Sequence, residues 1–193
     1  MAFTLPCVLF AGGKSSRMGR DKTLLPFGGY ETLAEYQFRR LAPLFPSLHI
    51  STKEAKFPFD APLILDRADL YAPTAGLLAV FEALESDFFA LAVDTPFVNG
   101  AIIAKLFDAY EAGGAEAVIA RTPSGTHPMC GIYTQRLRPR LEAMVAAQSH
   151  RLNRLLEAAD TRFVDFPEDE PFFNMNTPEE YEKGRRGTVN GKR

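Results

Sequence analysis

The chain has 193 residues and a formal net charge of −2, and 46% of its residues are hydrophobic. This length suits one globular domain with a sizeable core. The charge argues against a general nucleic-acid-binding protein, which is more often strongly basic, and no apolar run is long enough to span a membrane. The only cysteines, Cys7 and Cys130, are too few for a disulfide framework. Since the first residues also lack a secretory signal, we expect a cytoplasmic protein.

Strands and helices are predicted to alternate along the chain. Short apolar runs predict strands at residues 5–10, 48–51, 63–65, 88–93, 117–120, 129–133 and 162–166. Helical spacing and capping residues predict helices at residues 31–44, 74–84, 99–110, 136–147 and 152–159, and one that begins at Thr177. This order predicts a three-layer α/β/α fold, of Rossmann-like topology, around a mostly parallel sheet. We assign residues 1–183 to one domain and the polar, basic residues 184–193 to a flexible tail.

The stretch AGGKSSRMGRDK, residues 11–22, follows the first predicted strand. In such folds ligands bind beyond the carboxyl ends of the strands, often at this first turn. Gly12 and Gly13 let the backbone approach a ligand and turn N–H groups toward an anion. Positive charge comes from Lys14, Arg17, Arg20 and Lys22. A nucleoside triphosphate is the natural candidate, and a solvated basic turn is the alternative.

The glycine spacing of this loop excludes two common phosphate-binding motifs. A Walker A loop needs a glycine at position 8, where this chain has Val8. Gly12, Gly13 and Gly19 do not match the dinucleotide-binding fingerprint either. The loop therefore predicts anion binding of another type.

Two aspartates follow predicted strands. Asp94 ends the apolar run 88–93, where a carboxylate is costly unless it is solvated or paired. It can bind Mg²⁺, which prefers oxygen ligands and bridges to phosphates, or it can cap a turn before Pro96. Asp66 follows residues 63–65, and its residue type alone favours an ordinary surface or capping carboxylate.

Six stretches together resemble the molybdenum cofactor guanylyltransferase (MobA) family, whose members make molybdopterin guanine dinucleotide. The first stretch is also similar to a wider group of nucleotidyltransferases with a sugar-nucleotide-transferase-like fold. In the family's order, the stretches are LFAGGKSSRMGRDKTLLPFGG, LILDRADLYAPTAGLLA, ALAVDTPFV, HPMCGIY, SHRLNRLLE and FFNMNTPEEY. The resemblance covers nearly the whole chain.

The resemblance implies that GMP is transferred from GTP to the terminal phosphate of molybdopterin, with release of pyrophosphate. The residues implied in GTP binding are Phe10, Ala11, Gly12, Gly13, Lys22, Ser51, Asp66 and Asp94. Lys22, Arg17 and Asp94 are the implied catalytic residues, and Asp94 is the implied ligand of Mg²⁺ or Mn²⁺. The candidates for contact with the second substrate are His127, Arg151, Asn174 and Asn176.

Some of these residues also have plain structural interpretations. His127 could bond a backbone carbonyl, and Arg151 could be a surface arginine that opens a helix. Phe172 and Phe173 are expected to belong to the core rather than to stack on a base.

Four positions depart from the family pattern. Phe10 replaces a leucine, Ser51 and Lys53 replace asparagines, and Ala72 replaces the first glycine of a Gly-Pro-x-Ala-Gly loop. These changes affect the expected base selectivity more than the reaction type. No general base is expected, because a phosphate monoester with a second pKa of about 6 is already largely ionised at neutral pH.

Three alternatives remain at the level of sequence. One is a related enzyme with another base or acceptor, such as molybdopterin cytidylyltransferase or the guanylyltransferase of cobamide synthesis. Another is a regulatory nucleotide-binding module, which the presence of both Lys22 and Asp94 disfavours. The third is a partner-binding protein. The expected partners are the two small-molecule substrates and, transiently, cofactor-synthesis proteins or molybdoenzymes, with no nucleic acid and no membrane.

Overall fold

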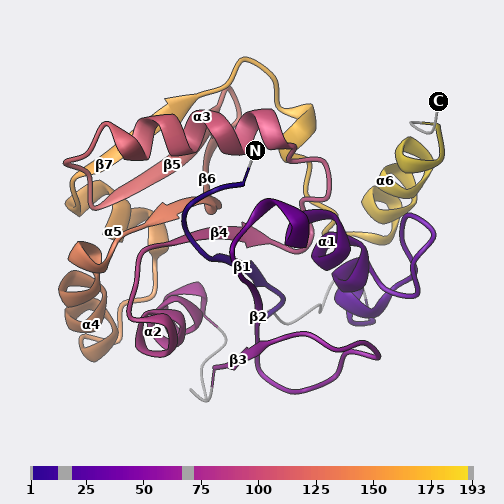
Figure 1. Ribbon diagram of the computed structural model, residues 1–193, viewed down its shortest axis with the longest axis horizontal. Helices are drawn as coiled ribbons and strands as arrows, with labels where there is room; N and C mark the ends of the chain where they lie inside the picture. Colours follow the sequence, from indigo (N-terminus) through magenta and orange to yellow (C-terminus); the bar gives the residue numbers. More distant parts are fainter. Residues whose placement is uncertain (1, 13–18, 67–71, 191–193) are drawn as a thin grey trace.

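The computed structural model describes residues 2–12, 19–66 and 72–190, the last three as backbone only. A seven-stranded sheet runs through this part of the chain in the order β3-β2-β1-β4-β6-β5-β7 (Figure 1). The strands are β1 (Cys7–Phe10), β2 (Leu48–Thr52), β3 (Leu63–Leu65), β4 (Phe88–Ala92), β5 (Ala117–Thr122), β6 (Gly125–Tyr133) and β7 (Thr161–Asp165). The helices are α1 (Leu33–Leu41), α2 (Pro73–Leu84), α3 (Gly100–Glu111), α4 (Arg138–Ala146), α5 (Leu152–Ala158) and α6 (Pro178–Asn190). Short 3-10 turns are η1 (Lys22–Leu24), η2 (Ala42–Leu44), η3 (Gln135–Leu137) and η4 (Glu170–Phe172).

Helices cover both faces of the sheet, as the predicted three-layer fold requires. Helices α1, α3 and α6 share one core with alternate residues of the strands, including Phe89 and Leu91 of β4. Helices α2, α4 and α5 pack on the other face, against Phe88 and Ala90 of the same strand. This alternation follows from the two-residue period of a strand.

Strand β6 runs antiparallel to both of its neighbours, β4 and β5, while the other strand pairs are parallel. The mostly parallel sheet expected from the sequence is therefore confirmed, with one reversed strand near its centre. The pairing of β5 with β6 shifts between Ile119, opposite Gly131, and Ala120, opposite His127. Such an irregularity redirects a strand, and here it lies next to Pro128, which has no N–H to donate to the ladder.

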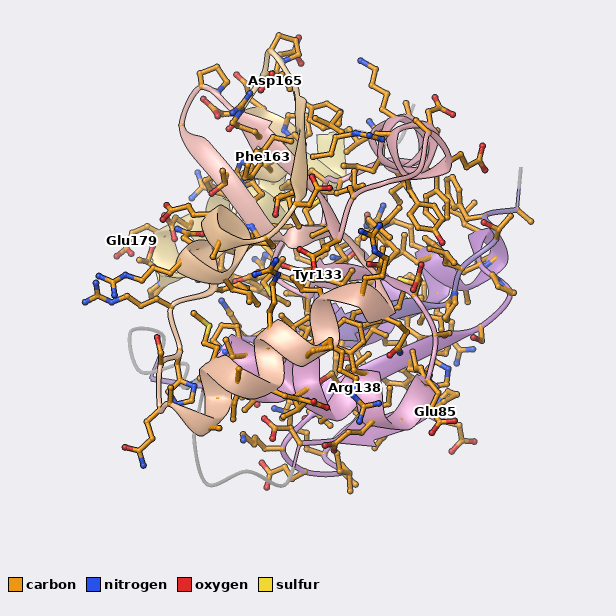
Figure 2. All side chains as sticks on the ribbon, turned by 90° about the vertical axis from the view of Figure 1, so that its left-hand side faces the viewer. Glu85, Tyr133, Arg138, Phe163, Asp165 and Glu179 are labelled. Atoms are coloured by element: carbon orange, nitrogen blue, oxygen red, sulfur yellow. The ribbon has the colours of Figure 1, made fainter. Side chains whose placement is uncertain are left out.

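The side of the molecule formed by α4 and α5 is a packed surface rather than part of the cavity described below. In Figure 2, which faces this side, Tyr133 lies near the centre, Arg138 lies below it, and Glu85 lies at the lower right edge. Tyr133 is fully buried, and Arg138 forms an ion pair with Glu142 at 2.7 Å. None of the described residues of α4 and α5 lines the cavity.

Helix α6 differs from the sequence prediction. Residues 184–190, which we expected in a flexible tail, are helical. Of the two glycines that suggest a loop in the sequence, Gly184 instead allows close packing, whereas Gly187 has room for a side chain. A Cβ on Gly184 would lie 2.5 Å from Met175 Sδ, and one on Gly187 would lie 3.9 Å from the Phe97 ring. In the described part of the chain, no helix is both long enough and apolar enough to cross a membrane.

Candidate active site

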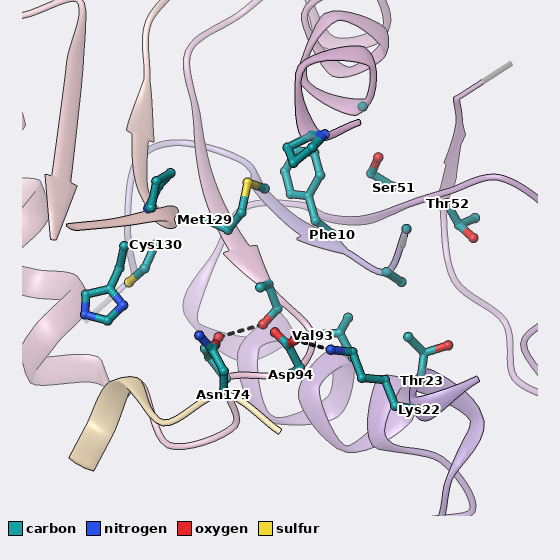
Figure 3. Close-up of a pocket in the computed structure, with 18 of the residues that line it drawn as sticks. Phe10, Lys22, Thr23, Ser51, Thr52, Val93, Asp94, Met129, Cys130 and Asn174 are labelled. Atoms are coloured by element: carbon teal, nitrogen blue, oxygen red, sulfur yellow. Dashed lines mark hydrogen bonds and ion pairs between the residues drawn. The ribbon is translucent and has the colours of Figure 1, made fainter. Parts of the chain in front are cut away.

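A cavity of about 480 Å³ opens at the carboxyl edge of the parallel strands (Figure 3). The pairing of β1 with β2 and β4 sets Phe10 beside Ser51 and Ala92, so these three strands end together. The residues that follow them line the cavity, as the topology of such sheets predicts. Because β6 runs the other way, its first residues reach the same edge and line the cavity from the opposite side.

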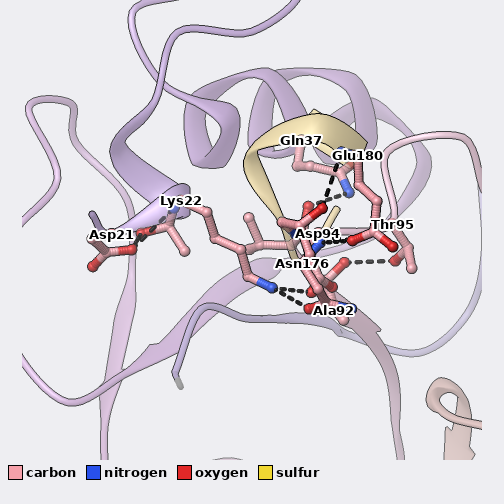
Figure 4. Close-up of polar contacts among 11 residues, drawn as sticks. Asp21, Lys22, Gln37, Ala92, Asp94, Thr95, Asn176 and Glu180 are labelled. Atoms are coloured by element: carbon pink, nitrogen blue, oxygen red, sulfur yellow. Dashed lines mark hydrogen bonds and ion pairs between the residues drawn. The ribbon is translucent and has the colours of Figure 1, made fainter. Parts of the chain in front are cut away.

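Lys22, in the loop that the sequence predicts to bind phosphate, contacts two other segments that line the cavity. Its Nζ forms an ion pair with the Asp94 carboxylate and donates a hydrogen bond to Asn176 Oδ1 at 2.8 Å (Figure 4). These contacts span 72 and 154 residues of sequence. Two side-chain oxygens therefore converge on one cation, in a cluster whose charged side chains are only 19% (Lys22) and 15% (Asp94) exposed.

Asp21 and Lys56 fix the turn that carries Lys22. Asp21 caps the 3-10 turn η1 by accepting hydrogen bonds from the Thr23 N–H at 3.0 Å and the Thr23 hydroxyl at 2.7 Å. Lys56, from the connection between β2 and β3, pairs with the other Asp21 oxygen at 2.5 Å. Burial would raise the pKa of Asp21, but the hydrogen bonds from Lys56 and Thr23 outweigh it and lower the pKa. Asp21 therefore remains an anion that holds the turn.

A capping box at the start of α6 fixes Asn176. Glu180 accepts hydrogen bonds from the Asn176 and Thr177 N–H groups at 2.8 and 2.9 Å, and the Thr177 hydroxyl accepts one from the Glu180 N–H at 3.2 Å. This is the reciprocal arrangement that the sequence Thr-Pro-Glu-Glu predicts. The preceding residue, Met175, is fully buried, and its N–H donates to the Asp94 carbonyl oxygen at 3.1 Å. The backbones that carry Asn176 and Asp94 are thus joined directly.

The end of the cavity beside the edge strand β3, which we call its outer end, holds a second ion pair. Lys53, which follows β2, pairs with Asp66, which follows β3, at 2.7 Å. Both side chains are largely buried, with exposed fractions of 18% and 8%. At the same end, a Cβ on Gly76 of α2 would lie 3.4 Å from the Phe10 ring and 3.6 Å from Ser51 Oγ. A small residue at position 76 therefore lets α2 approach the ends of β1 and β2.

His127 forms part of the opposite wall, on β6. Its ring stacks on Phe172 with centroids 4.6 Å apart, and its Nε2 lies 2.9 Å from the Thr122 hydroxyl oxygen. Burial lowers the pKa of His127, and the opposing field of Asp169 does not cancel this effect. The imidazole is therefore a neutral, flat surface at neutral pH rather than a cation.

Comparisons with known proteins agree with this geometry. The family model described as a MobA-like NTP transferase domain matches residues 7–163. The chain belongs to the MobA-like NTP transferase family. A molybdenum cofactor guanylyltransferase from Campylobacter jejuni is 33% identical to this chain over 182 residues, which cover 93% of this chain and 94% of the relative. One from Helicobacter pylori strain G27 is 34% identical over 185 residues, covering 92% and 90%.

Solved structures of this fold include other nucleotidyltransferases. Molybdopterin-guanine dinucleotide biosynthesis protein A from Archaeoglobus fulgidus superposes with a TM-score of 0.84 at 20% identity, covering 96% of this chain and all (100%) of that chain. The 2-C-methyl-D-erythritol 4-phosphate cytidylyltransferase from Thermus thermophilus superposes with a TM-score of 0.70 at 14% identity, covering 97% and 100%. The predicted α/β nucleotidyltransferase fold is confirmed, and so is the enzyme class.

The structure brings most of the predicted MobA-like site residues into one cavity. Those that line it are Phe10, Ala11, Gly12, Lys22, Ser51, Asp66, Asp94, His127, Asn174 and Asn176. Gly13 and Arg17 lie outside the described residues. Arg151 is exposed at the N-cap of α5 and is not among the lining residues, so its placement favours the surface arginine that opens a helix.

Several contacts of the site were not predicted from the sequence. They include the Lys22–Asn176 hydrogen bond, the Lys53–Asp66 ion pair and the stacking of His127 on Phe172. Phe172 is 2% exposed, which confirms the expected core position, and it also lines the cavity. The residue types alone carry no signal for these pairs, because each joins segments that only the sheet order brings together.

Proposed function

We propose that this chain transfers GMP from GTP to the terminal phosphate of molybdopterin, forming molybdopterin guanine dinucleotide and pyrophosphate. The observation that carries the proposal is the convergence of Lys22, Asp94 and Asn176 at the strand ends, in one cavity with Asp66. The proposal is also supported by the guanylyltransferases that are 33–34% identical to this chain over nearly its whole length.

The chemistry follows from charge. The acceptor phosphate attacks the α-phosphorus, a new P–O bond forms, and the bond to the β-phosphate oxygen breaks. Lys22 is assigned to neutralise the departing pyrophosphate, together with the backbone N–H of Gly12. Gly13 and Arg17 are assigned to the same group on the family resemblance. Since the acceptor phosphate is already ionised, no side chain has to remove a proton from it.

The donor set at Asp94 fits a hard divalent cation. Among the described residues, no group of three or more His, Cys, Asp or Glu side chains is arranged to hold a metal ion. Mg²⁺, however, typically uses one or two carboxylates and completes its shell with phosphates and water. The Lys22 ammonium already occupies a position between Asp94 and Asn176 oxygens. We therefore assign Asp94 as the ligand of Mg²⁺ or Mn²⁺, which would supply charge neutralisation at the phosphate oxygens when bound.

The two substrates are assigned to the two ends of the cavity. Asp66, with Lys53 and Ser51, is assigned to the nucleoside of GTP, because these residues lie on the outer strands, away from β6. His127 and Asn174 are assigned to molybdopterin, on the side of β6 and η4. Free thiols at Cys7 and Cys130 support action in the reducing cytoplasm. Transient docking with cofactor-synthesis proteins or molybdoenzymes is part of the same hypothesis.

The decisive experiment is a transfer assay with molybdopterin and α-labelled GTP, CTP or ATP, each with and without Mg²⁺. We expect Mg²⁺-dependent pyrophosphate release and labelled product with GTP alone. Asp94→Asn should abolish most turnover, by about 10²–10³-fold for the loss of one charge-stabilising group. Asp60→Asn, an exposed carboxylate in the β2–β3 connection, is the matched control. Preference for CTP would instead indicate a cytidylyltransferase, and no turnover with any nucleotide would contradict the proposal.

A further inference from the structure

We propose that Gln37 and Arg40 of helix α1 are positioning residues that hold the turn carrying Asp94 in place for nucleotidyl transfer. The inference rests on the proposed function, because it assumes that Asp94 acts in the reaction. Neither residue lines the cavity, so neither is a catalytic residue.

Gln37 and Arg40 bind the two ends of the turn. Gln37 Nε2 donates a hydrogen bond to the Val93 carbonyl oxygen at 3.0 Å, immediately before Asp94 (Figure 4). Arg40 Nη1 donates to the Val98 carbonyl oxygen at 2.6 Å. Residues 94–97, and with them the Asp94 carboxylate, are therefore bracketed by two hydrogen bonds from one helix.

The two side chains also fix one another. Arg40 Nε donates to Gln37 Oε1 at 3.2 Å, and its Nη2 contacts the same oxygen. Because Oε1 must accept these bonds, the amide nitrogen faces Val93. Gln37 is fully buried, and in the described part of the chain Arg40 has no carboxylate partner within ion-pair distance.

Such an arrangement is unusual for a core that needs only stability. A half-buried arginine without a carboxylate is unfavourable, and desolvation lowers the pKa of Arg40 here. An apolar pair would fill the same space between α1 and the sheet. The polar pair instead satisfies two carbonyl groups at the point where β4 ends and the chain turns toward α3.

The turn is also the place where Asp94 and Asn176 are joined. The Asp94 carbonyl oxygen accepts the Met175 N–H, so a shift of the turn moves the backbone that carries Asn176. Both Asp94 and Asn176 contact Lys22. Loss of the hydrogen bonds from Gln37 and Arg40 to the turn should therefore disturb the reacting end of the cavity, with Lys22 and Asp94. It should leave the outer end, with Asp66, unchanged.

The test compares Gln37→Glu with Gln135→Glu. A glutamate at 37 still accepts from Arg40, which favours folding, but it cannot donate to Val93. Gln135 is the matched control, because its Nε2 also donates to a backbone carbonyl beside β4, that of Ser86 at 3.1 Å, but at the opposite end of the strand. Arg40→Lys is the second variant if Gln37→Glu does not fold, since a single ammonium cannot reproduce the guanidinium contacts.

Two measurements are made on each variant, amide hydrogen exchange of the peptide covering residues 93–98 and steady-state kinetics. For Gln37→Glu we expect faster exchange in that peptide, kcat lower by about 10–100-fold, and KM for GTP nearly unchanged. For Gln135→Glu we expect neither effect. Unchanged exchange, or faster exchange with unchanged kcat, would overturn the proposal. Absence of turnover in the unmodified enzyme would contradict the proposed function, and the exchange comparison would still decide whether the bracket exists.

Discussion

Lys22 and Asp94 neutralise each other across the centre of the cavity. They come from the first βα connection and from the end of β4, 72 residues apart, and both side chains are more than four-fifths buried. In the proposed reaction the same two groups bind opposite charges, Lys22 the phosphates and Asp94 a divalent cation. Binding of a metal–nucleotide complex would therefore replace the ion pair between Lys22 and Asp94 with two others, one between Lys22 and the phosphates and one between Asp94 and the metal ion.

The first prediction concerns metal binding without nucleotide. Lys22→Met should raise the affinity for Mn²⁺ alone by at least about tenfold, corresponding to ~1.4 kcal/mol, because the competing ammonium is gone. The same variant should lose nearly all transfer activity. Electron paramagnetic resonance of free Mn²⁺ measures the first effect, and Lys105→Met, at an exposed lysine on α3, is the control. Weaker Mn²⁺ binding in Lys22→Met would show that Lys22 does not compete for Asp94.

The second prediction concerns the outer ion pair. Asp66→Asn should raise KM for GTP by about tenfold or more, the cost of one hydrogen bond to a charged group, with a smaller change in kcat. The reason is that Asp66 and Lys53 lie away from Lys22, at the end assigned to the nucleoside. Steady-state kinetics with varied GTP checks it, with Asp60→Asn, at an exposed carboxylate on the other side of β3 in the sequence, as control. A fall in kcat at constant KM would move Asp66 to the reacting end.

The third prediction concerns pH. Burial lowers the pKa of His127 below 6.5, its ordinary value. The unfolded chain therefore binds this proton more readily than the folded protein. The stability from neutral His127 is fully present above pH 6.5 and is lost as the pH falls through the lowered folded pKa.

Thermal melts between pH 7.5 and pH 5 test this expectation. His127→Asn should lose less stability than the unmodified protein over that interval. His49→Asn should behave in the same direction, because burial lowers the pKa of His49 too. Equal pH dependence in all three proteins would show that neither His127 nor His49 has a pKa lowered by folding.

The fourth prediction concerns the close contact between β5 and β6. A Cβ on Gly131 would lie 2.3 Å from the Val118 carbonyl oxygen and 2.7 Å from Ile119 Cδ1. Gly131→Ala should therefore destabilise the protein by about 1–3 kcal/mol. Gly100→Ala is the matched control, because no atom lies within 4 Å of its Cβ and the site is in a helix, where alanine stabilises by about 0.4–1 kcal/mol. Urea unfolding should give opposite signs for the two.

The parts of the fold that local patterns determine were predicted well. The strand at Leu63–Leu65 and the capping roles of Asn99 and Thr177 agree with the structure. Strand β6 begins at Gly125 rather than 129, because pairing with β5 extends a strand through residues whose sequence suggests a turn. Helix α6 continues through Gly184 because Met175 packs against it, a tertiary effect that helix propensity does not contain.

The candidate site was predicted less completely. Asp94 and Lys22 could be identified because strand ends and a glycine-rich loop have recognisable local patterns. Gln37 could not, since its spacing from Leu33 and Leu41 indicates the core-facing side of a helix but not which carbonyl group its amide binds. Only the structure shows that Gln37 is fully buried beneath Val93.

The reversed direction of β6 has an evolutionary consequence. The residues at the proposed nucleotide end of the cavity lie at or after the ends of strands that run toward it, in the first half of the chain. His127 instead lies near the start of β6, which runs away from the cavity. The two binding surfaces are therefore encoded in separate stretches of the gene. Under the proposed assignment of the substrates, substitutions around residues 125–130 would remodel the acceptor surface and leave the stretch from 51 to 76 unchanged. Specificity for one substrate could then diverge without a change in specificity for the other.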